Sequence, residues 1–325
     1  MENGIVGRGA RVTTFGFGAA PIGNLFSAIS DEQAGEAIEA AWAAGVRYFD
    51  TAPHYGLGLS ERRLGAALRG RPRDSYTLST KVGRLLVPSS AGGRDDQGFD
   101  VPADHRRVWD FSRDGVRRSI GESLERLGHD SVDIVLIHDP DDHWAQAAGE
   151  AYPALAELRD EGVIKAVGVG MNQWQMPARF VRETDLDLVM LAGRYTLLDQ
   201  SGADELLPLC EARGVAVFAA GVFNSGLLAT HDATGTYNYG PAPAALVERT
   251  RRIAAVCEQY GVTLPHAALA FPSRHPAVTS VVAGARSAGE VERNAALAAA
   301  PVPGELWTAL AGESLITDPT MESRR

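Results

Sequence analysis

The sequence has little cysteine, no excess of basic residues and no long apolar run. Its 325 residues include two cysteines, Cys210 and Cys257, which argues against a disulfide framework and fits a reducing compartment. A formal net charge of −10 argues against nucleic-acid binding, which normally needs a basic face. No stretch reaches the length of a membrane span, and the N-terminus does not resemble a signal peptide. We therefore expect a cytoplasmic protein that binds neither nucleic acid nor membrane.

A glycine fingerprint for dinucleotide phosphates is also missing. Gly16 and Gly18 begin such a pattern, but Pro21 stands where the third glycine is needed, and no helix is predicted to start there. This counts against a doubly wound sheet, which remains the competing architecture.

Eight short apolar runs, each followed by a helical pattern, are the main feature that is present. Such runs suit parallel strands buried on both faces. They occupy residues 14–18, 46–50, 76–80, 133–137, 164–169, 188–191, 215–219 and 279–283. The helical patterns include one capped by Ser30, one begun by Ser60, and residues 116–127, 151–159, 203–213 and 244–260. Eight such units predict an α/β fold of the (β/α)8 TIM-barrel type, forming a single domain over residues 1–325.

Polar residues at the ends of three successive strands indicate a catalytic site. Asp50, Lys81 and His138 end their runs, and Tyr55 lies in the loop after the first of them. In a barrel these ends meet around one cavity. A lysine ammonium favours the phenolate of a nearby tyrosine and so equips it for acid–base catalysis, while an aspartate keeps the lysine charged. The histidine can donate a hydrogen bond to a carbonyl or alcohol oxygen.

Other interpretations stay open for these residues. Each one alone is often structural: a surface lysine, an aspartate in a turn or a satisfied histidine. Residues 138–143, HDPDDH, also offer several metal ligands, but a metal-dependent hydrolase needs further ligands from other strands. We predict no metal site. Two long segments without periodicity, residues 85–110 and 229–243, are predicted to be loops that wall the substrate site.

Four motifs in succession resemble those of the aldo-keto reductases. They are VRYFDTAPHYGLGLSERRLGAAL, STKVGR, ESLERLGHDSVDIVLIHD and GVIKAVGVGMNQW, and the resemblance runs from about Phe15 to the end of the chain. This family consists of (β/α)8 barrel oxidoreductases that use a nicotinamide cofactor. The resemblance implies that Tyr55 is the general acid–base, Lys81 its activator, Asp50 the lysine's partner and His138 the group that orients the substrate.

The same resemblance implies a set of cofactor contacts. Asn172 matches the asparagine that binds the nicotinamide carboxamide. The other implied cofactor-binding residues are Gly18, Asp50, Phe223, Asn224, Ser225, Gly226, Leu228, Gly284, Arg286, Glu290 and Asn294. Backbone N–H groups in such segments can hold phosphates without a glycine fingerprint.

Three departures from the family pattern concern the cofactor. Ala192 stands where a glutamine is usual, and Ala220 stands where a tyrosine usually stacks on the nicotinamide; Phe223 is a candidate replacement. Where NADP-preferring members have basic residues, this chain has Gly284 and Glu290. An acidic side chain suits the ribose hydroxyls of NAD, so NAD is favoured, although Arg286 leaves NADP open.

Several further stretches resemble the sugar-oxidising branch of the family, which includes D-threo-aldose and L-fucose dehydrogenases. They include GRLLVPSS, MLAGRYTLLDQ, GVFNSGLLAT and TYNYGPAP. We expect oxidation of the C1 hydroxyl of an aldose such as L-fucose, D-arabinose or L-galactose to a lactone, with the sugar contacted by His54, Trp109, Tyr237 and Tyr239. Alternatives are a pyridoxal 4-dehydrogenase, a general NADPH aldehyde reductase and a cofactor-binding regulatory subunit.

Overall fold

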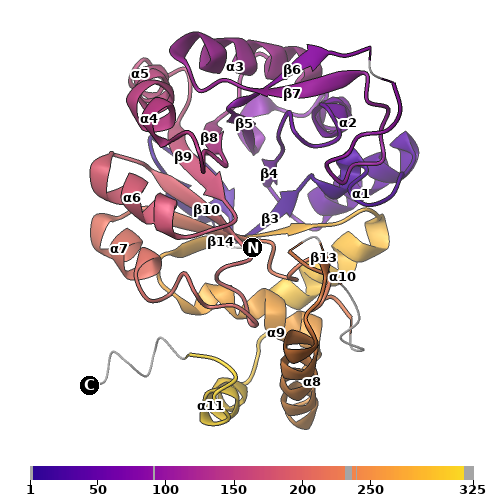
Figure 1. Ribbon diagram of the computed structural model, residues 1–325. Helices are drawn as coiled ribbons and strands as arrows, with labels where there is room; N and C mark the ends of the chain where they lie inside the picture. Colours follow the sequence, from indigo (N-terminus) through magenta and orange to yellow (C-terminus); the bar gives the residue numbers. More distant parts are fainter. Residues whose placement is uncertain (1–2, 91, 231–235, 239, 318–325) are drawn as a thin grey trace.

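Eight parallel strands close on themselves into a barrel (Figure 1). The computed structural model describes residues 3–90, 92–230, 236–238 and 240–317. Each barrel strand pairs with the next along the chain, and the last pairs with the first. The strands are β3 (Phe15–Gly18), β4 (Tyr48–Asp50), β5 (Thr77–Val82), β8 (Ile134–His138), β9 (Ala166–Met171), β10 (Leu188–Ala192), β11 (Ala216–Ala220) and β14 (Val278–Gly284). The predicted TIM barrel is confirmed.

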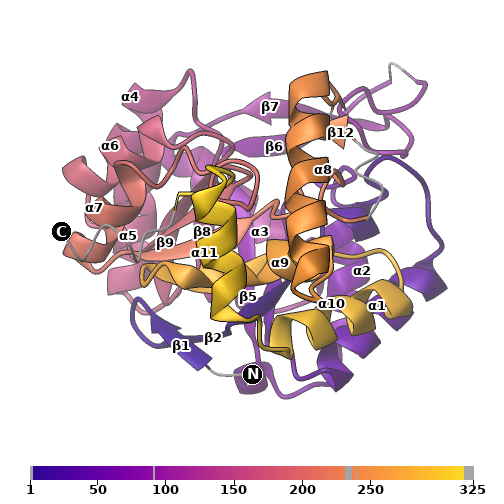
Figure 2. The same cartoon turned by 90° about the horizontal axis from the view of Figure 1, so that it is seen from below.

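Helices surround the barrel on the outside (Figures 1 and 2). They are α1 (Asp31–Ala43), α2 (Leu59–Leu68), α3 (Arg113–Leu127), α4 (Trp144–Gln146), α5 (Tyr152–Asp160), α6 (Gln175–Glu183), α7 (Leu206–Arg213), α8 (Ala244–Gln259), α9 (Leu264–Ala270), α10 (Ala288–Ala299) and α11 (Gly304–Gly312). Short 3-10 helices lie between helices and barrel strands at η1 (Pro21–Gly23), η2 (Arg73–Ser75) and η4 (Pro272–Arg274), and a π-helix, η3 (Ala147–Ala151), joins α4 to α5. The predicted cap of α1 is present, because Ser30 Oγ accepts the N–H of Gln33. In the described ranges no helix is both long and apolar enough to cross a membrane.

The pleat of the strands separates an outer core from the interior of the barrel. Alternate side chains point to opposite faces, so Leu78 on β5 packs in the core under the helices, whereas Ser79 faces inward and bonds to Tyr48 at 2.9 Å. Tyr48 also packs against Phe218 from the far side of the barrel, with ring centres 4.9 Å apart. Room for this tyrosine depends on Gly16, where a Cβ would lie 2.6 Å from the Tyr48 ring.

A hairpin that sequence analysis did not predict closes the lower end of the barrel. Its strands are β1 (Asn3–Val6) and β2 (Ala10–Thr13), and Val6, Ala10 and Val12 join the inner core. The Arg8 N–H donates to the carbonyl of Lys165 at 2.7 Å. The hairpin lies at the opposite end of the molecule from strands β6 and β7 (Figure 2).

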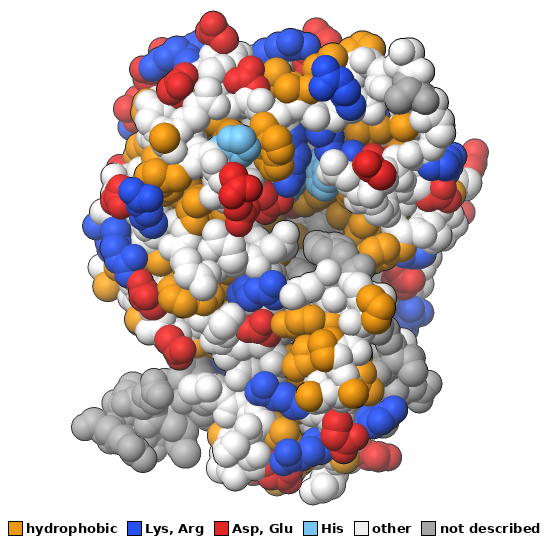
Figure 3. Space-filling view, viewed as in Figure 1, with side chains coloured by type: hydrophobic (Ala, Val, Ile, Leu, Met, Phe, Trp, Pro, Cys, Tyr) orange, Lys and Arg blue, Asp and Glu red, His pale blue; other side chains and the backbone are white. Residues whose placement is uncertain are grey.

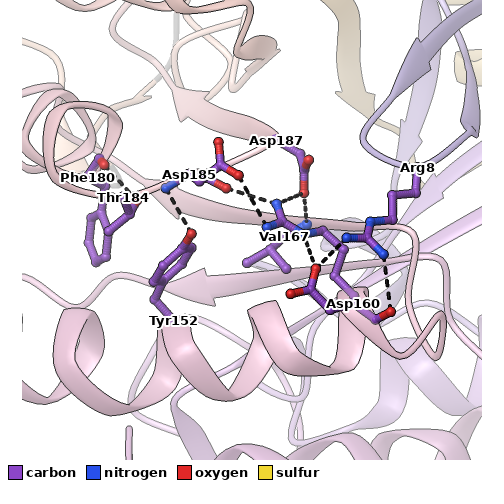
Figure 4. Close-up of polar contacts among 9 residues, drawn as sticks. Arg8, Tyr152, Asp160, Val167, Phe180, Thr184, Asp185 and Asp187 are labelled. Atoms are coloured by element: carbon purple, nitrogen blue, oxygen red, sulfur yellow. Dashed lines mark hydrogen bonds and ion pairs between the residues drawn. The ribbon is translucent and has the colours of Figure 1, made fainter.

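A polar network fastens α5 to this closed end (Figure 4). The buried guanidinium of Arg159 donates to Asp187 Oδ2 and to the carbonyl of Asp185, each at 2.9 Å. The same Asp187 oxygen accepts the N–H of Val167 at 2.8 Å, so one carboxylate links the starts of β9 and β10 to the helix. Arg8 pairs with Asp160 and ties the hairpin to α5. These contacts connect the N-terminal hairpin, α5 and the starts of β9 and β10.

The segment predicted as a long loop over residues 85–110 contains an antiparallel hairpin, so that prediction was wrong in part. Strands β6 (Arg84–Pro88) and β7 (His105–Trp109) pair in register above the barrel mouth. A long connecting segment, residues 89–104, separates the two strands along the chain, so local periodicity does not reveal their pairing. The second predicted loop includes a two-residue pair, β12 (Thr236–Tyr237) and β13 (Gly240–Pro241). The helix predicted over residues 203–213 begins at Leu206, and α2 begins at Leu59, one residue before Ser60.

A buried ion pair between α2 and α3 provides a test of this packing. Glu61 is fully buried and accepts from Arg126 Nε at 2.6 Å and from Thr80 Oγ1 at 2.8 Å. Arg126→Leu should lower the free energy of unfolding by roughly 3–5 kcal/mol, because Glu61 is left buried and uncompensated. Arg118→Leu, which breaks an exposed pair with Glu122 on the same helix, should leave stability near the wild-type value in urea unfolding. Equal losses in both variants would contradict the assignment.

Candidate active site

The centre of the site is a buried ion pair between neighbouring strands. Lys81 Nζ donates to Asp50 Oδ2 at 2.6 Å and to the carbonyl of Thr51 at 3.0 Å. The other carboxylate oxygen of Asp50 accepts from Ser79 Oγ at 2.7 Å. The two charged side chains are 2% and 3% exposed. Burial acts to lower the pKa of Lys81, but Asp50 and Tyr55 outweigh it, so the pKa is raised and the ammonium form persists.

Tyr55 lies directly beside this ion pair. Its side chain is hydrogen-bonded to Lys81, and the Nζ atom lies 4.8 Å from the centre of the tyrosine ring. The loop that carries Tyr55 packs unusually close to η1. A Cβ on Gly23 would lie 2.9 Å from the Tyr55 carbonyl, and one on Gly56 (φ 62°) would lie 2.2 Å from the Gly23 oxygen. Only glycine at both positions allows this approach.

His138 is held from the other side of the site. Its Nδ1 lies 2.9 Å from Arg84 Nη1, and its Nε2 lies 3.5 Å from Asp139 Oδ2. Arg84 also donates to Asp139 at 2.8 Å. Burial, followed by the charges of Arg84 and Lys81, holds the pKa of His138 well below its usual value. The imidazole is therefore neutral in neutral solution.

The residues after β6 pack over Tyr55 and shape the mouth of the barrel. Phe99 lies against the rings of Tyr55 and His54, with centres 6.0 and 5.2 Å apart. Arg107 forms a buried pair with Asp95 at 2.5 Å and donates to the His54 carbonyl at 2.8 Å. Burial and nearby cations lower the pKa of His54 to about 2, so this imidazole is also neutral. The site thus presents two neutral histidines next to one tyrosine.

One cavity of about 1080 Å³ extends from the ends of β4, β5 and β8 to the start of α10. In the space-filling view this face is hollowed near its centre, beside histidine, basic and hydrophobic side chains (Figure 3). Asp50, Tyr55, Lys81 and His138 line one end. The predicted cofactor residues on the wall are Gly18, Asn172, Phe223, Asn224, Ser225, Gly226, Gly284, Arg286, Glu290 and Asn294. Ala192 and Ala220 also line it.

The donors along this cavity fit an elongated dinucleotide. Asn172 near the catalytic end, and Arg293 and Asn294 at the far end, line the wall. No hydrogen bond or ion pair is made by any of these three side chains within the described part of the chain, so all three are available to a ligand. An amide at one end and a guanidinium at the other suit a carboxamide and a phosphorylated nucleotide. The residues present therefore fit a nicotinamide dinucleotide.

Some predicted contacts are placed elsewhere. Leu228 is fully buried in the outer core and does not line the cavity. Asn224 lines it, but its amide group is engaged by Thr196 at 2.7 Å and Gly193 at 3.3 Å, so it also holds the loop together. Arg286 donates to Ser27 Oγ at 2.5 Å and to the Leu25 carbonyl, across the cavity rim.

Only one of the four predicted substrate residues is found on the described wall. His54 lines the cavity. Trp109 stacks on Phe111 outside it, with ring centres 5.7 Å apart. The Tyr237 hydroxyl donates to Asp199 at 2.8 Å, which turns the side chain to a neighbouring loop. Tyr239 lies outside the described residues.

Sequence reasoning missed the groups that hold the catalytic side chains. Ser79 orients Asp50, Phe99 packs on Tyr55, and Arg84 and Asp139 surround His138. A signal did exist for three of them, because Ser79 and Arg84 begin and end the STKVGR motif and Asp139 directly follows His138. Phe99 lies in the segment that connects β6 to β7, and no motif in the sequence marks it.

This arrangement can move a proton next to a bound polar substrate. A tyrosine hydroxyl, an adjacent ammonium and a neutral histidine converge on one end of a cavity long enough for a dinucleotide. In the described ranges, no group of three or more His, Cys, Asp or Glu side chains is arranged to hold a metal ion. The geometry favours proton transfer coupled to redox chemistry.

Comparison with known proteins identifies the family of the chain. The model of the "Aldo/keto reductase family" matches residues 14–312. The chain is similar to a D-threo-aldose 1-dehydrogenase from Pseudomonas sp., with 49% identity over 96% of this chain and 97% of the relative. It is 41% identical to a pyridoxal 4-dehydrogenase from Microbacterium luteolum, over 97% and 98% of the two chains.

A solved structure shows the same fold. It is the holo form of an aldo-keto reductase from Bacillus halodurans, with a TM-score of 0.77 and 24% identity over 98% of this chain and 97% of that one. The family match and the two relatives confirm the family that the four sequence motifs indicated. The chain is an oxidoreductase that belongs to the aldo/keto reductase family.

Proposed function

We propose that this chain is an aldose 1-dehydrogenase that oxidises the C1 hydroxyl of a cyclic sugar to a lactone with a nicotinamide cofactor. The observation that carries the proposal is the convergence of Lys81, Tyr55 and His138 at one end of the cavity. The similarity to a relative named as a D-threo-aldose 1-dehydrogenase supports the aldose as substrate. Similarity to a pyridoxal 4-dehydrogenase supports the second candidate.

Tyr55 is the proton acceptor in this scheme. Lys81, kept charged by Asp50, stabilises the phenolate, which takes the proton of the C1 hydroxyl. The C1–H bond breaks with both of its electrons, and the C1–O bond becomes the lactone carbonyl. When bound, the nicotinamide cofactor accepts that hydride. Both the proton and the two electrons are thereby accounted for.

The two neutral histidines serve substrate binding. His138 donates a hydrogen bond to the C1 oxygen and so fixes its distance from Tyr55. His54 lies beside it and lines the same cavity, with ring centres 5.7 Å apart. This histidine is positioned to bind a second sugar hydroxyl. Phe99 and Tyr55 offer apolar surfaces for the face of the ring.

NAD is the proposed cofactor. Glu290 lines the far end of the cavity, and its carboxylate accepts the N–H of Arg286 at 2.9 Å. The guanidinium of Arg286 is turned toward Ser27 and Leu25. An acidic side chain at this end accepts ribose hydroxyls and repels a 2′-phosphate. Arg293 is the cation available to a nucleotide phosphate.

The Tyr55→Phe variant tests the proton acceptor. Its kcat should fall by roughly a hundredfold to ten-thousandfold, while the dissociation constant for the cofactor, measured by fluorescence titration, stays unchanged. Tyr152→Phe is the matched control, because it removes a hydroxyl that bonds to Asp185 at the closed end of the barrel (Figure 4). Near-normal turnover in Tyr55→Phe would remove Tyr55 from this role.

The substrate is tested by nicotinamide absorbance assays that cross NAD and NADP with L-fucose, D-arabinose, L-galactose and pyridoxal. We expect reduction of NAD with at least one aldose, and a lactone as product by mass spectrometry. Turnover with pyridoxal alone would favour the second candidate. No reduction with any sugar would refute the aldose proposal.

The cofactor choice is tested with Glu290→Gln, which keeps the hydrogen-bond acceptor and removes the charge. The ratio of kcat/KM with NADP to kcat/KM with NAD should rise about tenfold, since one lost repulsion of about 1.4 kcal/mol has that effect. Glu292→Gln, on an exposed position of the same helix, is the control and should leave the ratio unchanged. An unchanged ratio in Glu290→Gln would show that this carboxylate does not select the cofactor.

A further inference from the structure

Arg84 makes three contacts at the edge of the site, and the proposed reaction assigns no role to this residue. Its guanidinium donates to His138 Nδ1 at 2.9 Å and to Asp139 Oδ2 at 2.8 Å, and its central carbon lies 4.4 Å from the centre of the Trp109 ring. The side chain is 11% exposed. A guanidinium fixed by an imidazole, a carboxylate and an indole is not available as a general binding site for anions.

The backbone on both sides is shaped for this arrangement. Gly83 has φ 110°, and a Cβ there would lie 2.2 Å from the Phe111 ring, so the chain can turn sharply from β5 into β6 only with glycine. Asp139 has φ 42°, which is a costly conformation for a residue other than glycine. This turn is stabilised by a bond from its N–H to the Gly170 carbonyl at 3.0 Å, and it brings the carboxylate next to Arg84.

The contact from Arg84 determines where the His138 proton resides. A guanidinium has only donors, so His138 Nδ1 must accept, and a neutral ring then carries its proton on Nε2. Nε2 makes no hydrogen bond in the described part of the chain, and its 3.5 Å separation from Asp139 is long for one. The Nε2–H group is therefore free for a substrate oxygen.

The surroundings also oppose protonation of this ring. The charged and titratable groups that face it are Arg84, Lys81, His54, Arg107, Asp139 and Tyr55. Burial and the cations lower the pKa of His138, and Arg84 is the first of those cations. Protonated His138 would place an N–H directly against the guanidinium, so the same contact selects both the tautomer and the neutral form.

We propose that Arg84, oriented by Asp139, is a positioning residue that fixes His138 as the neutral Nε2–H tautomer, so that the site offers the substrate oxygen a hydrogen-bond donor that does not change with pH. The kinetic part of this inference rests on the proposed dehydrogenase function. The structural part concerns His138 alone and holds for any substrate. Metal-bound histidines are tuned by second groups in the same way.

The direct test is nitrogen NMR of histidine-labelled full-length enzyme, with the His138 signals assigned from a His138→Asn spectrum. In the wild type, Nε2 should be protonated, Nδ1 unprotonated, and both signals constant through the range in which free histidine titrates, about pH 5.5 to 7.5. A wild-type ring that is protonated at Nδ1, or that titrates in this range, would overturn the proposal without any variant.

Variants then test whether Arg84 is the residue that fixes the His138 tautomer. In Arg84→Met the His138 signals should shift toward a mixture of tautomers, and the pKa of His138 should rise, because one of the cations that lower it is removed. Arg106→Met, which removes an exposed positive charge from the same hairpin, should retain the wild-type spectrum. Arg84→Lys keeps the charge and a donor and should retain the Nε2 tautomer. If Arg84→Met gives the wild-type spectrum, or Arg84→Lys behaves like Arg84→Met, the proposal fails.

Kinetics provide the second readout. Arg84→Met should lower kcat by about tenfold to a hundredfold. Complete loss of one oriented donor to a reacting oxygen lowers kcat by about a hundredfold to a thousandfold, and this variant keeps the donor but no longer fixes its position. The ionisation of His138 in its kcat/KM profile should lie at a higher pH than in the wild type and in Arg106→Met. A rise in KM for anionic substrates only, with kcat and the spectrum unchanged, would instead make Arg84 a binding residue and overturn the inference. If no sugar is oxidised, the dehydrogenase proposal fails, but the NMR spectra still test the tautomer of His138. Failure of one proposal can therefore be distinguished from failure of the other.

Discussion

The buried ion pair between Asp50 and Lys81 is the interaction on which the site depends. Burying two charges costs several kcal/mol per ion, and attraction repays this only with good geometry and further hydrogen bonds. Both conditions are met, because parallel strands set the side chains 2.6 Å apart and Ser79 and Thr51 supply the additional bonds. The ammonium that results lies beside Tyr55 and is hydrogen-bonded to it, and the proposed proton transfer by this hydroxyl rests on that contact.

The contacts that hold the strands together and the cavity with the candidate site lie at opposite ends of the barrel. At the closed end, Arg159 and the N-terminal hairpin bind the strand starts together, and none of the described polar groups in that network lines the cavity. At the open end, loops from distant parts of the chain are joined across the mouth. Arg286 holds Leu25 and Ser27, and Leu25 in turn forms a bridge with Phe99, which packs on Tyr55. The loop that carries Arg286 is thus connected, through Leu25 and Phe99, to the loop that carries Tyr55.

The parts of this picture that could be predicted are those governed by local periodicity. Short apolar runs locate the strands, and the rule that chemistry collects at their carboxyl ends is enough to select Asp50, Lys81 and His138. Positions that depend on contacts between distant segments could not be obtained in this way. The pairing of β6 with β7, the burial of Leu228 and the turn of Tyr237 toward Asp199 each follow from partners that periodicity does not reveal. The contacts of Arg84 with His138 and Asp139 likewise become visible only in three dimensions, although the motif around Arg84 and the position of Asp139 next to His138 mark both residues in the sequence.

The most direct test of the central claim is a double-mutant cycle on kcat/KM for aldose oxidation, with Asp50→Asn, Lys81→Met and the two combined. If the carboxylate acts only by holding the lysine charged beside Tyr55, each single variant should lose most of the activity. The double variant should then be no worse than the poorer single one, because residues that act as a unit are not additive. Losses that multiply in the double variant, or near-normal activity in either single variant, would contradict the account.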